Sequence, residues 1–335
     1  MKNKILFVFR YPSSFVKNDL EILKENYDVI PLHATNNLLK TLFKFLLYTR
    51  KVDLIFVWFA GHQAFLSVLF AKIFRKKSIV VAGGYDVANV PELNYGAFTR
   101  LKKRLPAKFA LKFTDMVLAV SNFTKSETLR QVRPKRIEVV YNGVNIERFK
   151  PAQEKEDNLV ITVSGINWLN LKRKGIETFV KSAKFTPKAH FVVIGKFIDN
   201  SIDYLKSIAS SNIKFTDLVS DEDLIKWYQK TKVICQLSYY EAFGLAPAEC
   251  MACGCIPVVT EKGGLPEIVG DTGFYVPYDD EKATAEAIKQ ALASPKKGKK
   301  ARKRIISSFS IKEREKQLVK IINELLEKGE KNEYL

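Results

Sequence analysis

Short apolar runs alternate with longer amphipathic segments along almost the whole chain. Runs that are apolar at every position, rather than at every second one, are typical of strands in a parallel sheet covered on both faces. The segments between them have the spacing of amphipathic helices. In the first half of the chain the predicted strands are KILFVF, YDVIPL, LIFVWF, SIVVAGG, MVLAVS and IEVVYN.

The same pattern restarts after Pro151 and a polar stretch, AQEKEDN. Its predicted strands are NLVITVSG, HFVVIG, IKFTDL, VICQLS, IPVVTE and GFYVPY. Two such series in tandem predict an α/β protein with two Rossmann-like, doubly wound parallel-sheet domains that face a cleft. We place the N-terminal domain at residues 1–152 and the C-terminal domain at 158–310. A helix at 311–335 follows, and a return of this helix to the first domain is one option.

Hydropathy argues against a membrane-spanning segment. No apolar run in the 335 residues approaches the roughly 18 to 20 residues that a transmembrane helix needs. The opening segment is apolar only from Ile5 to Phe9, which is too short for the core of a signal peptide and suits a buried strand. These features predict a cytoplasmic protein, either free or peripheral on the inner face of the membrane.

The net charge of +19 lies mostly in the first half of the chain. Residues 1–150 contain 26 Lys and Arg against 11 Asp and Glu, and a field of this sign favours anionic partners. Two stretches, 36–51 and 98–114, mix Leu and Phe with Lys and Arg at helical spacing. They suit either helices that lie on an anionic membrane surface or ordinary helices with a buried apolar face. Without a recognition motif, the charge does not indicate nucleic acid as a partner.

The residue types that most often bind metals do not form a convincing metal site. The cysteines, which include a C-x-x-C-x-C run at 250–255, lie far in sequence from all three histidines. A structural zinc site usually needs four ligands in two separated pairs, so the cysteines are interpreted as small apolar residues of a packed unit. Asp279 and Asp280 are interpreted as the cap of the helix that follows them. No metal is expected.

The stretch SYYEAFGLAPAEC (238–250) places two carboxylates, Glu241 and Glu249, around a predicted strand-to-helix turn. Gly244 permits a tight turn, and the amides of Gly244, Leu245 and Ala246 would point outward at a helix N-terminus, where anions bind. Glu241 can accept hydrogen bonds from ligand hydroxyl groups near the start of this helix, and Glu249 can do so about one turn later. The pattern fits a diphosphate flanked by two polyhydroxylated rings, which describes a nucleotide sugar.

The same stretch resembles the E-x-F-G-[LI]-x-x-x-E element of retaining glycosyltransferases with the two-domain GT-B fold, the glycosyl transferases group 1 family or glycosyltransferase family 4. The resemblance continues in MACGCIPVVT, GGLPEIV and DTGFYV, and upstream in SNFTKSETL and VVYNGVNIERFKP. It is strong from about residue 115 to residue 290. It implies that Glu241 contacts the donor sugar, that Glu249 holds the ribose, and that residues Phe243 to Ala246 meet the sugar and phosphates.

Two segments depart from the family pattern. The family's G-R-L-x-x-x-K-G element corresponds to 163–179, where Gly165 and Lys174 are retained but Ile166 fills the position of the Arg. Arg173 or Lys172, in a loop three residues longer than usual, would then supply the second positive charge on the diphosphate.

The family's His-Asp pair is replaced by Tyr85 and Asp86, after a Gly83-Gly84 pair. The resemblance implies that Tyr85 donates a hydrogen bond to the donor sugar and that Asp86 accepts one from the acceptor. His62, at the junction between the third predicted strand and the next helix, is a candidate to compensate for the lost histidine. The retaining mechanism is not thought to need a protein nucleophile, so these departures leave transfer feasible.

The sequence therefore predicts a retaining, metal-independent hexosyltransferase without a cofactor, with Glu241, Tyr85 and Asp86 as its catalytic residues. Its donor would be a nucleotide diphosphate sugar and its acceptor a lipid-linked molecule or a glycan. Two alternatives remain open: a nucleotide-sugar epimerase with the same fold, and a catalytically silent, membrane-associated subunit that binds nucleotide sugars.

Overall fold

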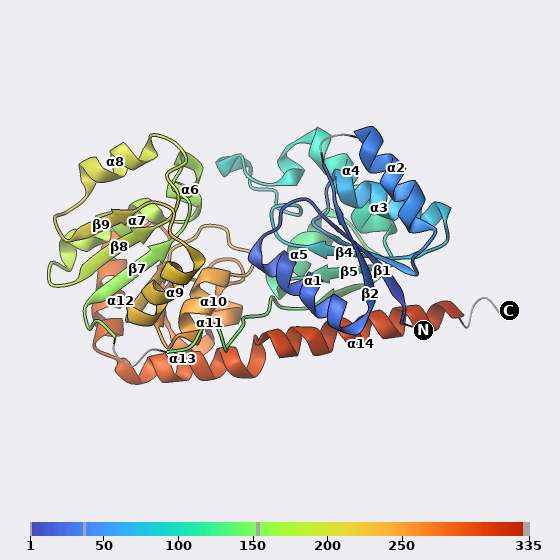
Figure 1. Cartoon of the computed structure of the whole chain (residues 1–335). Helices are drawn as coiled ribbons and strands as arrows, with labels where there is room; N and C mark the ends of the chain where they lie inside the picture. The colour runs from blue at the N-terminus through green and yellow to red at the C-terminus, as the bar shows by residue number, and fades with distance from the viewer. Residues whose placement is uncertain (1, 36–37, 152–154, 331–335) are drawn as a thin grey trace. The chain divides into compact units, whose positions relative to one another are not determined.

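Two parallel sheets of six strands each organise the residues that the computed structural model describes, which are 2–35, 38–151 and 155–330 (Figure 1). Helices cover both faces of each sheet. The chain divides into a first unit, which comprises the residues up to Gly143 and the segment from Ile311, and a second unit, Val144–Ser310. The predicted α/β class with two doubly wound parallel sheets is confirmed.

The first sheet has the strand order β2-β1-β3-β4-β5-β6. The chain runs outward from β1 to β2 and then returns to β3 on the other side of β1, so the order reverses between β1 and β3. In open α/β sheets ligands bind beyond the carboxyl ends of the strands that flank such a reversal. The strands, all at the predicted positions, are β1 (Lys4–Phe9), β2 (Asp28–His33), β3 (Leu54–Trp58), β4 (Lys77–Ala82), β5 (Met116–Ala119) and β6 (Ile137–Val139).

The helices of the first unit form a layer on each face of its sheet (Figure 1). Helices α2, α3 and α4 pack side by side over one face, where apolar side chains of α3 and α4 meet the central strands. Helices α1, α5 and α14 cover the other face. Their bounds are α1 (Ser14–Asn26), α2 (Leu38–Thr49), α3 (His62–Ile73), α4 (Leu101–Phe113), α5 (Asn122–Gln131) and α14 (Ile311–Glu330), with short 3-10 turns η1 (Pro91–Leu93) and η2 (Ala97–Thr99).

The second sheet repeats this topology with the order β12-β11-β10-β7-β8-β9, and its order reverses between β7 and β10. The predicted strand positions are again confirmed, with bounds β7 (Leu159–Val163), β8 (His190–Ile194), β9 (Ile213–Thr216), β10 (Val233–Gln236), β11 (Ile256–Thr260) and β12 (Phe274–Val276).

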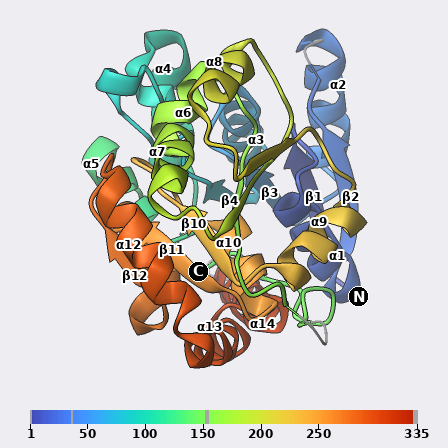
Figure 2. The same ribbon diagram turned by 90° about the vertical axis from the view of Figure 1, so that its left-hand side faces the viewer.

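The helices of the second unit are also divided between two faces. Helices α7 and α12 lie side by side on one face, as Figure 2 shows, and α10 packs with α9 and α13 on the other. The bounds are α6 (Trp168–Arg173), α7 (Ile176–Ser182), α8 (Ser201–Ile208), α9 (Asp221–Lys230), α10 (Leu245–Ala252), α11 (Leu265–Val269), α12 (Glu281–Leu292), α13 (Pro295–Ser308), η3 (Ala183–Phe185) and η4 (Gly270–Thr272). No helix of the described residues is long and apolar enough to cross a membrane.

The division between the units lies before the polar stretch and not at residue 152, where the sequence suggested it. Phe149 packs against Tyr228 of α9, with ring centroids 6.0 Å apart, and the backbone carbonyl of Phe149 accepts a hydrogen bond from Arg302. Residues 144–151 therefore share the core of the second unit. Residues 152–154, at the start of the expected linker, lie outside the described residues.

Helix α14 is held to the first unit by a buried ion pair. The guanidinium of Arg314 donates from Nε and Nη2 to the two carboxylate oxygens of Asp19 in α1, at 2.5 and 2.7 Å. Its Nη1 donates to the carbonyls of Val140 and Tyr141, and the indole of Trp58 donates to Asp19. Both charged side chains are almost completely buried. The last helix thus completes the first unit, while residues 331–335 lie outside the described residues.

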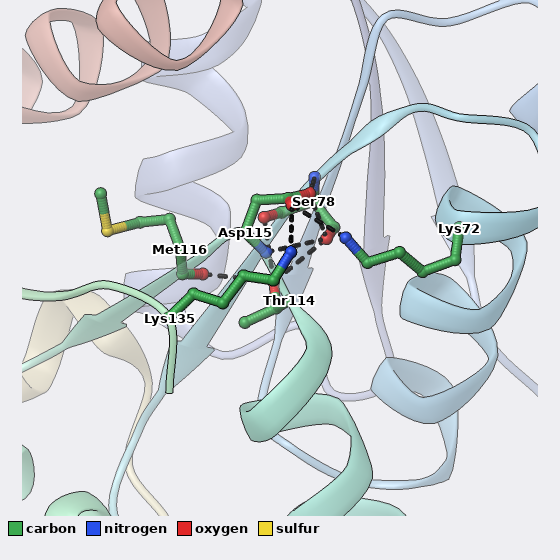
Figure 3. Close-up of polar contacts among 6 residues, drawn as sticks. All are labelled: Lys72, Ser78, Thr114, Asp115, Met116 and Lys135. Carbon is green, nitrogen blue, oxygen red and sulfur yellow. Dashed lines mark hydrogen bonds and ion pairs between the residues drawn. The ribbon is translucent and has the colours of Figure 1, made fainter. Parts of the chain in front are cut away.

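A second polar cluster, around Asp115, joins the amino ends of β4 and β5 to α3 (Figure 3). The Asp115 carboxylate accepts hydrogen bonds from Lys72 at 2.8 Å and from the Ser78 backbone and hydroxyl at 3.0 and 3.1 Å. Burial by itself raises the pKa of Asp115, but Lys72 and Ser78, together with Lys135, outweigh burial and lower it. Because ligands bind at the opposite ends of such strands, we interpret this cluster as structural.

Candidate functional site

The reversal of strand order in the second sheet brings two predicted site segments to one edge. β7 ends at Val163 and leads to Gly165, and β10 ends at Gln236 and leads to Glu241. The two strands are hydrogen-bonded neighbours, so both segments leave the sheet at adjacent carboxyl ends. These loops therefore lie where an open α/β sheet binds its ligands.

Two glycines let the loops at this edge pack closely. Gly175 has a φ of +65°, and a Cβ there would lie 2.1 Å from the carbonyl oxygen of Leu237. Gly263 has a φ of +63°, and a Cβ there would lie 2.2 Å from the carbonyl oxygen of Glu241. Only glycine tolerates both the left-handed backbone and this approach. The glycines of the Lys-Gly and Gly-Gly motifs thus position Lys174 and Glu241.

Lys174 and Glu241 form an ion pair in which the two side chains are only 19% and 13% exposed. Burial by itself raises the pKa of Glu241, but the positive charges of Lys174 and Arg173 outweigh burial and lower it. Burial lowers the pKa of Lys174, Glu241 opposes this effect, and Arg173 adds to it. Two cations therefore share one carboxylate, an arrangement that a further anion would stabilise.

The structure distinguishes the two candidates for the second cation. Lys172 is half exposed and pairs with Glu177 at 3.0 Å. Arg173, in contrast, acts electrostatically on the Lys174–Glu241 pair. Both residues belong to α6, the extra turn of helix that the longer loop forms. Ile166, at the position of the family's Arg, is completely buried and belongs to the core of the unit.

The turn after Glu241 leads directly into α10. Gly244 precedes this helix with a φ of +99°, and no side chain caps the first turn. Leu245 and Ala246 are partly exposed, so the amides of the first turn are available to an anion. Phe243 is only 2% exposed, and its ring packs against Phe309. The side chain of Phe243 is therefore part of the core, and only its backbone can meet a ligand.

Glu249 lies on α10, one turn after its start, beside the buried Tyr228. Burial raises the pKa of Glu249 to about 8, although the Tyr228 hydroxyl and the charge of Arg148 favour the ionised form. Asp221 raises the pKa further. Without a ligand, Glu249 is therefore mostly protonated at pH 7.

The first unit has a cavity of about 270 Å³ at the reversal of its own sheet. Arg10 follows β1, Phe59 and His62 follow β3, and Tyr85 follows β4, and all four line the cavity. Phe59 has a φ of +66°, which is rare for a residue with a bulky side chain. Its ring occupies the space where a Cβ of Gly83 would lie, only 2.3 Å away. The Gly-Gly pair before Tyr85 thus shapes the cavity wall.

Asp86 also lines the cavity, but its carboxylate joins two loops. One oxygen accepts the backbone N–H of Ala60 at 2.7 Å, and the other accepts those of Gly83 and Gly84 at 3.0 and 2.8 Å. Burial raises the pKa of Asp86 to about 6, although these backbone hydrogen bonds favour the ionised form. The side chain is thus oriented toward the backbone, where it fixes the loops after β3 and β4.

The sequence does not single out two cations of this cavity, Arg10 and Lys103. Arg10 directly follows the first apolar run, and this position at the carboxyl end of a strand is the signal that could have found it. Lys103 is one of several cations on α4, and nothing in the sequence distinguishes it from its neighbours. In the structure its Nζ donates to the Tyr85 hydroxyl at 2.9 Å.

Several of the residues considered for metal binding have other partners. The four cysteines are buried free thiols, and Cys255 donates to the carbonyl of Tyr228 at 3.1 Å. Asp280 caps α12 as predicted, accepting the backbone N–H groups of Lys282 and Ala283. Within the described ranges, no group of three or more His, Cys, Asp and Glu side chains is arranged to hold a metal ion.

Comparison with known proteins identifies similar glycosyltransferases. Residues 144–308 match the family model described as "Glycosyl transferases group 1", and residues 8–148 match the one described as "Glycosyltransferase Family 4". The alpha-maltose-1-phosphate synthase of Mycolicibacterium smegmatis is 25% identical over 269 residues, which are 70% of this chain and 65% of that protein. The O-antigen chain mannosyltransferase RfbU of Salmonella typhimurium is 29% identical over 202 residues, or 57% and 55% of the two chains. The match thus spans just over half to just under two thirds of these relatives.

Solved structures resemble the chain over nearly its whole length. HepE of Anabaena, crystallised in complex with UDP, has a TM-score of 0.79 at 17% identity, over 96% of this chain and all of that chain. Sucrose-phosphate synthase from Thermosynechococcus elongatus has a TM-score of 0.77 at 18% identity, over 97% and 99%. At these identities the likeness shows the fold, which is that of the GT-B glycosyltransferases.

Proposed function

Because the chain belongs to the glycosyl transferases group 1 family, also called glycosyltransferase family 4, we propose that it is a retaining glycosyltransferase. It moves a hexose from a nucleotide diphosphate sugar to a lipid-linked or glycan acceptor, without a divalent metal or a cofactor. The observation that carries this proposal is the largely buried Lys174–Glu241 pair, three residues before the uncapped first turn of α10.

The residues that bind the donor stabilise the negative charge that develops on the diphosphate during the reaction. The diphosphate lies against the amides of Gly244 to Ala246, and Lys174 and Arg173 neutralise it. As the bond between the sugar and the phosphate breaks, the leaving diphosphate gains negative charge, which fixed cations and amides stabilise. Glu241 meanwhile accepts a hydrogen bond from a hydroxyl of the transferred sugar. Gly165, which has no side chain, allows the ligand to approach the backbone after β7.

The acceptor hydroxyl then attacks, and the diphosphate leaves, on the same face of the sugar. The acceptor hydroxyl forms its bond to the anomeric carbon, the bond to the diphosphate breaks, and the hydroxyl proton passes to a phosphate oxygen. Configuration is retained without a protein nucleophile. Tyr85 donates a hydrogen bond to a sugar hydroxyl in the cavity of the first unit. Asp86 acts as a positioning residue, because its carboxylate holds the loops that form this cavity.

The known proteins support the donor class. HepE of Anabaena was also crystallised with UDP-glucose, and RfbU of Salmonella is a mannosyltransferase. An epimerase would need acid and base groups around a sugar carbon. A silent binding subunit would hold the donor without turning it over. A transferase would transfer the donor sugar, an epimerase would epimerise it, and a silent subunit would leave it unchanged, so the product distinguishes these three functions.

The donor's affinity is expected to rise about tenfold between pH 7 and pH 9, because Glu249, with a pKa of about 8, must lose its proton to accept both ribose hydroxyls. The carboxylate is the binding form, so affinity falls as the pH drops below 8. Titration calorimetry with the preferred nucleoside diphosphate measures this slope, and Glu249→Gln should abolish it. The same slope in the variant would assign the titration to another group.

We also propose that the first unit docks on anionic membranes through α2 and α4. Phe43, Leu46 and Leu47 are exposed on α2, and Leu101 and Leu105 are exposed on α4 among basic residues. Apolar side chains beside cations suit the interface of an anionic bilayer. The protein should sediment with vesicles that contain phosphatidylserine at low salt and dissociate at high salt. Equal sedimentation with neutral vesicles would contradict the electrostatic part of this proposal.

A further inference from the structure

The second unit has a cavity of about 640 Å³ at the ends of two neighbouring strands. β11 ends at Thr260 and β12 ends at Val276, and the two strands are paired in parallel. The cavity thus lies at the carboxyl edge of the sheet, where open α/β sheets bind ligands, and its volume falls within the roughly 300 to 1,000 Å³ of small-molecule sites. Its lining residues are Glu261, Lys262, Tyr275, Val276, Pro277 and Tyr278.

Both sides of this cavity connect to the proposed donor site. The loop after β11 continues into Gly263, which packs against the backbone of Glu241. On the side of β12, the Tyr278 hydroxyl donates a hydrogen bond to the carbonyl of Lys172 at 3.0 Å. Lys172 belongs to α6, the helix that also carries Arg173. The cavity therefore adjoins the donor site, although none of the residues assigned to the donor lines it.

The two tyrosines of the lining are held by their hydroxyl groups. Tyr278 is bound to α6, and the Tyr275 hydroxyl donates to the carbonyl of Gly270 at 2.7 Å. The ring of Tyr278 also packs edge-on against Tyr239, with centroids 5.0 Å apart. Because each hydroxyl proton is used by a protein carbonyl, the fixed rings are the main surface that these tyrosines present to a ligand.

The charged side chains of the lining balance each other. Among the described residues Glu261 is the one carboxylate and Lys262 the one cation in this lining, and neither forms an ion pair with another described residue. Lys262 contacts the Tyr239 ring, with its Nζ 5.8 Å from the ring centre. The lining thus favours neither anions nor cations. A carboxylate that accepts hydrogen bonds and an ammonium that donates them suit a neutral ligand with many hydroxyl groups.

We propose that this cavity is a glycan subsite, in which a sugar unit of the acceptor packs against the rings of Tyr275 and Tyr278. The apolar C–H face of a sugar ring suits a fixed aromatic ring, and its hydroxyl groups suit Glu261 and Lys262. A lipid chain would instead leave both charged groups without polar partners. The proposal rests on the proposed function and adds that the acceptor is itself a glycan or carries one.

Glycan binding to the full-length protein tests this proposal without turnover. An array of α- and β-linked hexose oligosaccharides identifies the glycans that bind, and titration calorimetry with the strongest of them measures its affinity. Tyr275→Ala and Tyr278→Ala each remove a ring, and Tyr275→Phe keeps the ring without the hydroxyl. Glu261→Ala removes an exposed side chain of the lining, where the fold is least affected. Leu218→Ala, an exposed apolar position of the same unit outside the cavity, is the control.

We expect the two ring deletions to weaken binding of this oligosaccharide about tenfold each, because aromatic side chains supply much of the energy of such contacts. Glu261→Ala should weaken it about fivefold through the loss of hydrogen bonds to hydroxyl groups. Tyr275→Phe and Leu218→Ala should change the affinity by less than about twofold. Thermal unfolding checks that each variant is folded.

The proposal is overturned if no glycan of the array binds, or if the two ring deletions and Glu261→Ala all bind as tightly as Leu218→Ala. Its fate is separate from that of the proposed function. A protein that binds glycans through these residues but never turns over a nucleotide sugar would keep the subsite and lose the transferase assignment. A transferase whose KM for an oligosaccharide acceptor is unchanged in the ring deletions would lose the subsite alone.

Discussion

Replacement of Glu241 by Gln is expected to lower the rate of sugar transfer about 100-fold, or roughly 2.7 kcal/mol in transition-state stabilisation. Two losses combine. The amide accepts a sugar hydroxyl more weakly than the carboxylate does. In addition, Lys174 loses the negative charge that opposes the effects of burial and of Arg173 on its pKa, so less of it remains protonated to meet the diphosphate.

Steady-state release of the nucleoside diphosphate measures this effect, and a denaturant titration checks that the fold is retained. Glu286→Gln, an exposed carboxylate on α12 of the same unit, is the matched control and should leave transfer within about twofold of the unchanged protein. If Glu241→Gln transfers as fast as this control, Glu241 has no part in catalysis.

Replacement of Arg314 by Met should have the largest effect on stability, with a loss of about 3 to 5 kcal/mol in the free energy of unfolding. The change leaves the Asp19 carboxylate buried, with a hydrogen bond from the Trp58 indole in place of the ion pair. It also removes the guanidinium nitrogen that donates to the carbonyls of Val140 and Tyr141. An unpaired buried charge costs far more than the loss of an exposed ion pair.

Urea unfolding of the full chain, followed by hydrogen exchange, checks this expectation. The amides of α14 and α1 should lose protection first, because the ion pair joins these two helices. Lys312→Met changes an exposed cation on the same helix, and we expect it to alter stability by less than about 0.5 kcal/mol. Equal effects of the two replacements would mean that the Arg314–Asp19 pair does not hold the helix.

Much of the fold follows from the sequence because strands of a parallel sheet are apolar along their whole length. Runs such as LIFVWF and IPVVTE have no polar face, so their placement between two helical layers is the one that buries them. The position of the proposed donor site follows too, since Gly165 and Glu241 lie in the loops that follow β7 and β10. The pairing of α14 with α1 does not follow, because Arg314 is one cation among many until the structure buries it.

Side-chain partners within the site are the part that the sequence leaves open. Arg173 and Lys172 are adjacent and chemically similar, and only the ion pair of Lys172 with Glu177 separates Lys172 from the proposed diphosphate site. Asp86 has the residue type of an acceptor-binding group, yet three backbone N–H groups orient its carboxylate. Such choices depend on contacts between segments far apart in the chain, which a linear pattern does not record.

The fate of the donor is the most direct test of the central claim. The full-length protein would be incubated, without divalent metal, with UDP-, GDP- and ADP-hexoses and with lipid-linked and glycan acceptors, and the products followed by NMR. We predict that one nucleotide series yields the nucleoside diphosphate and a new glycoside with the donor's anomeric configuration, and that Lys174→Ala abolishes this product. An epimerised donor, an unchanged donor, or equal transfer by the variant would contradict the account.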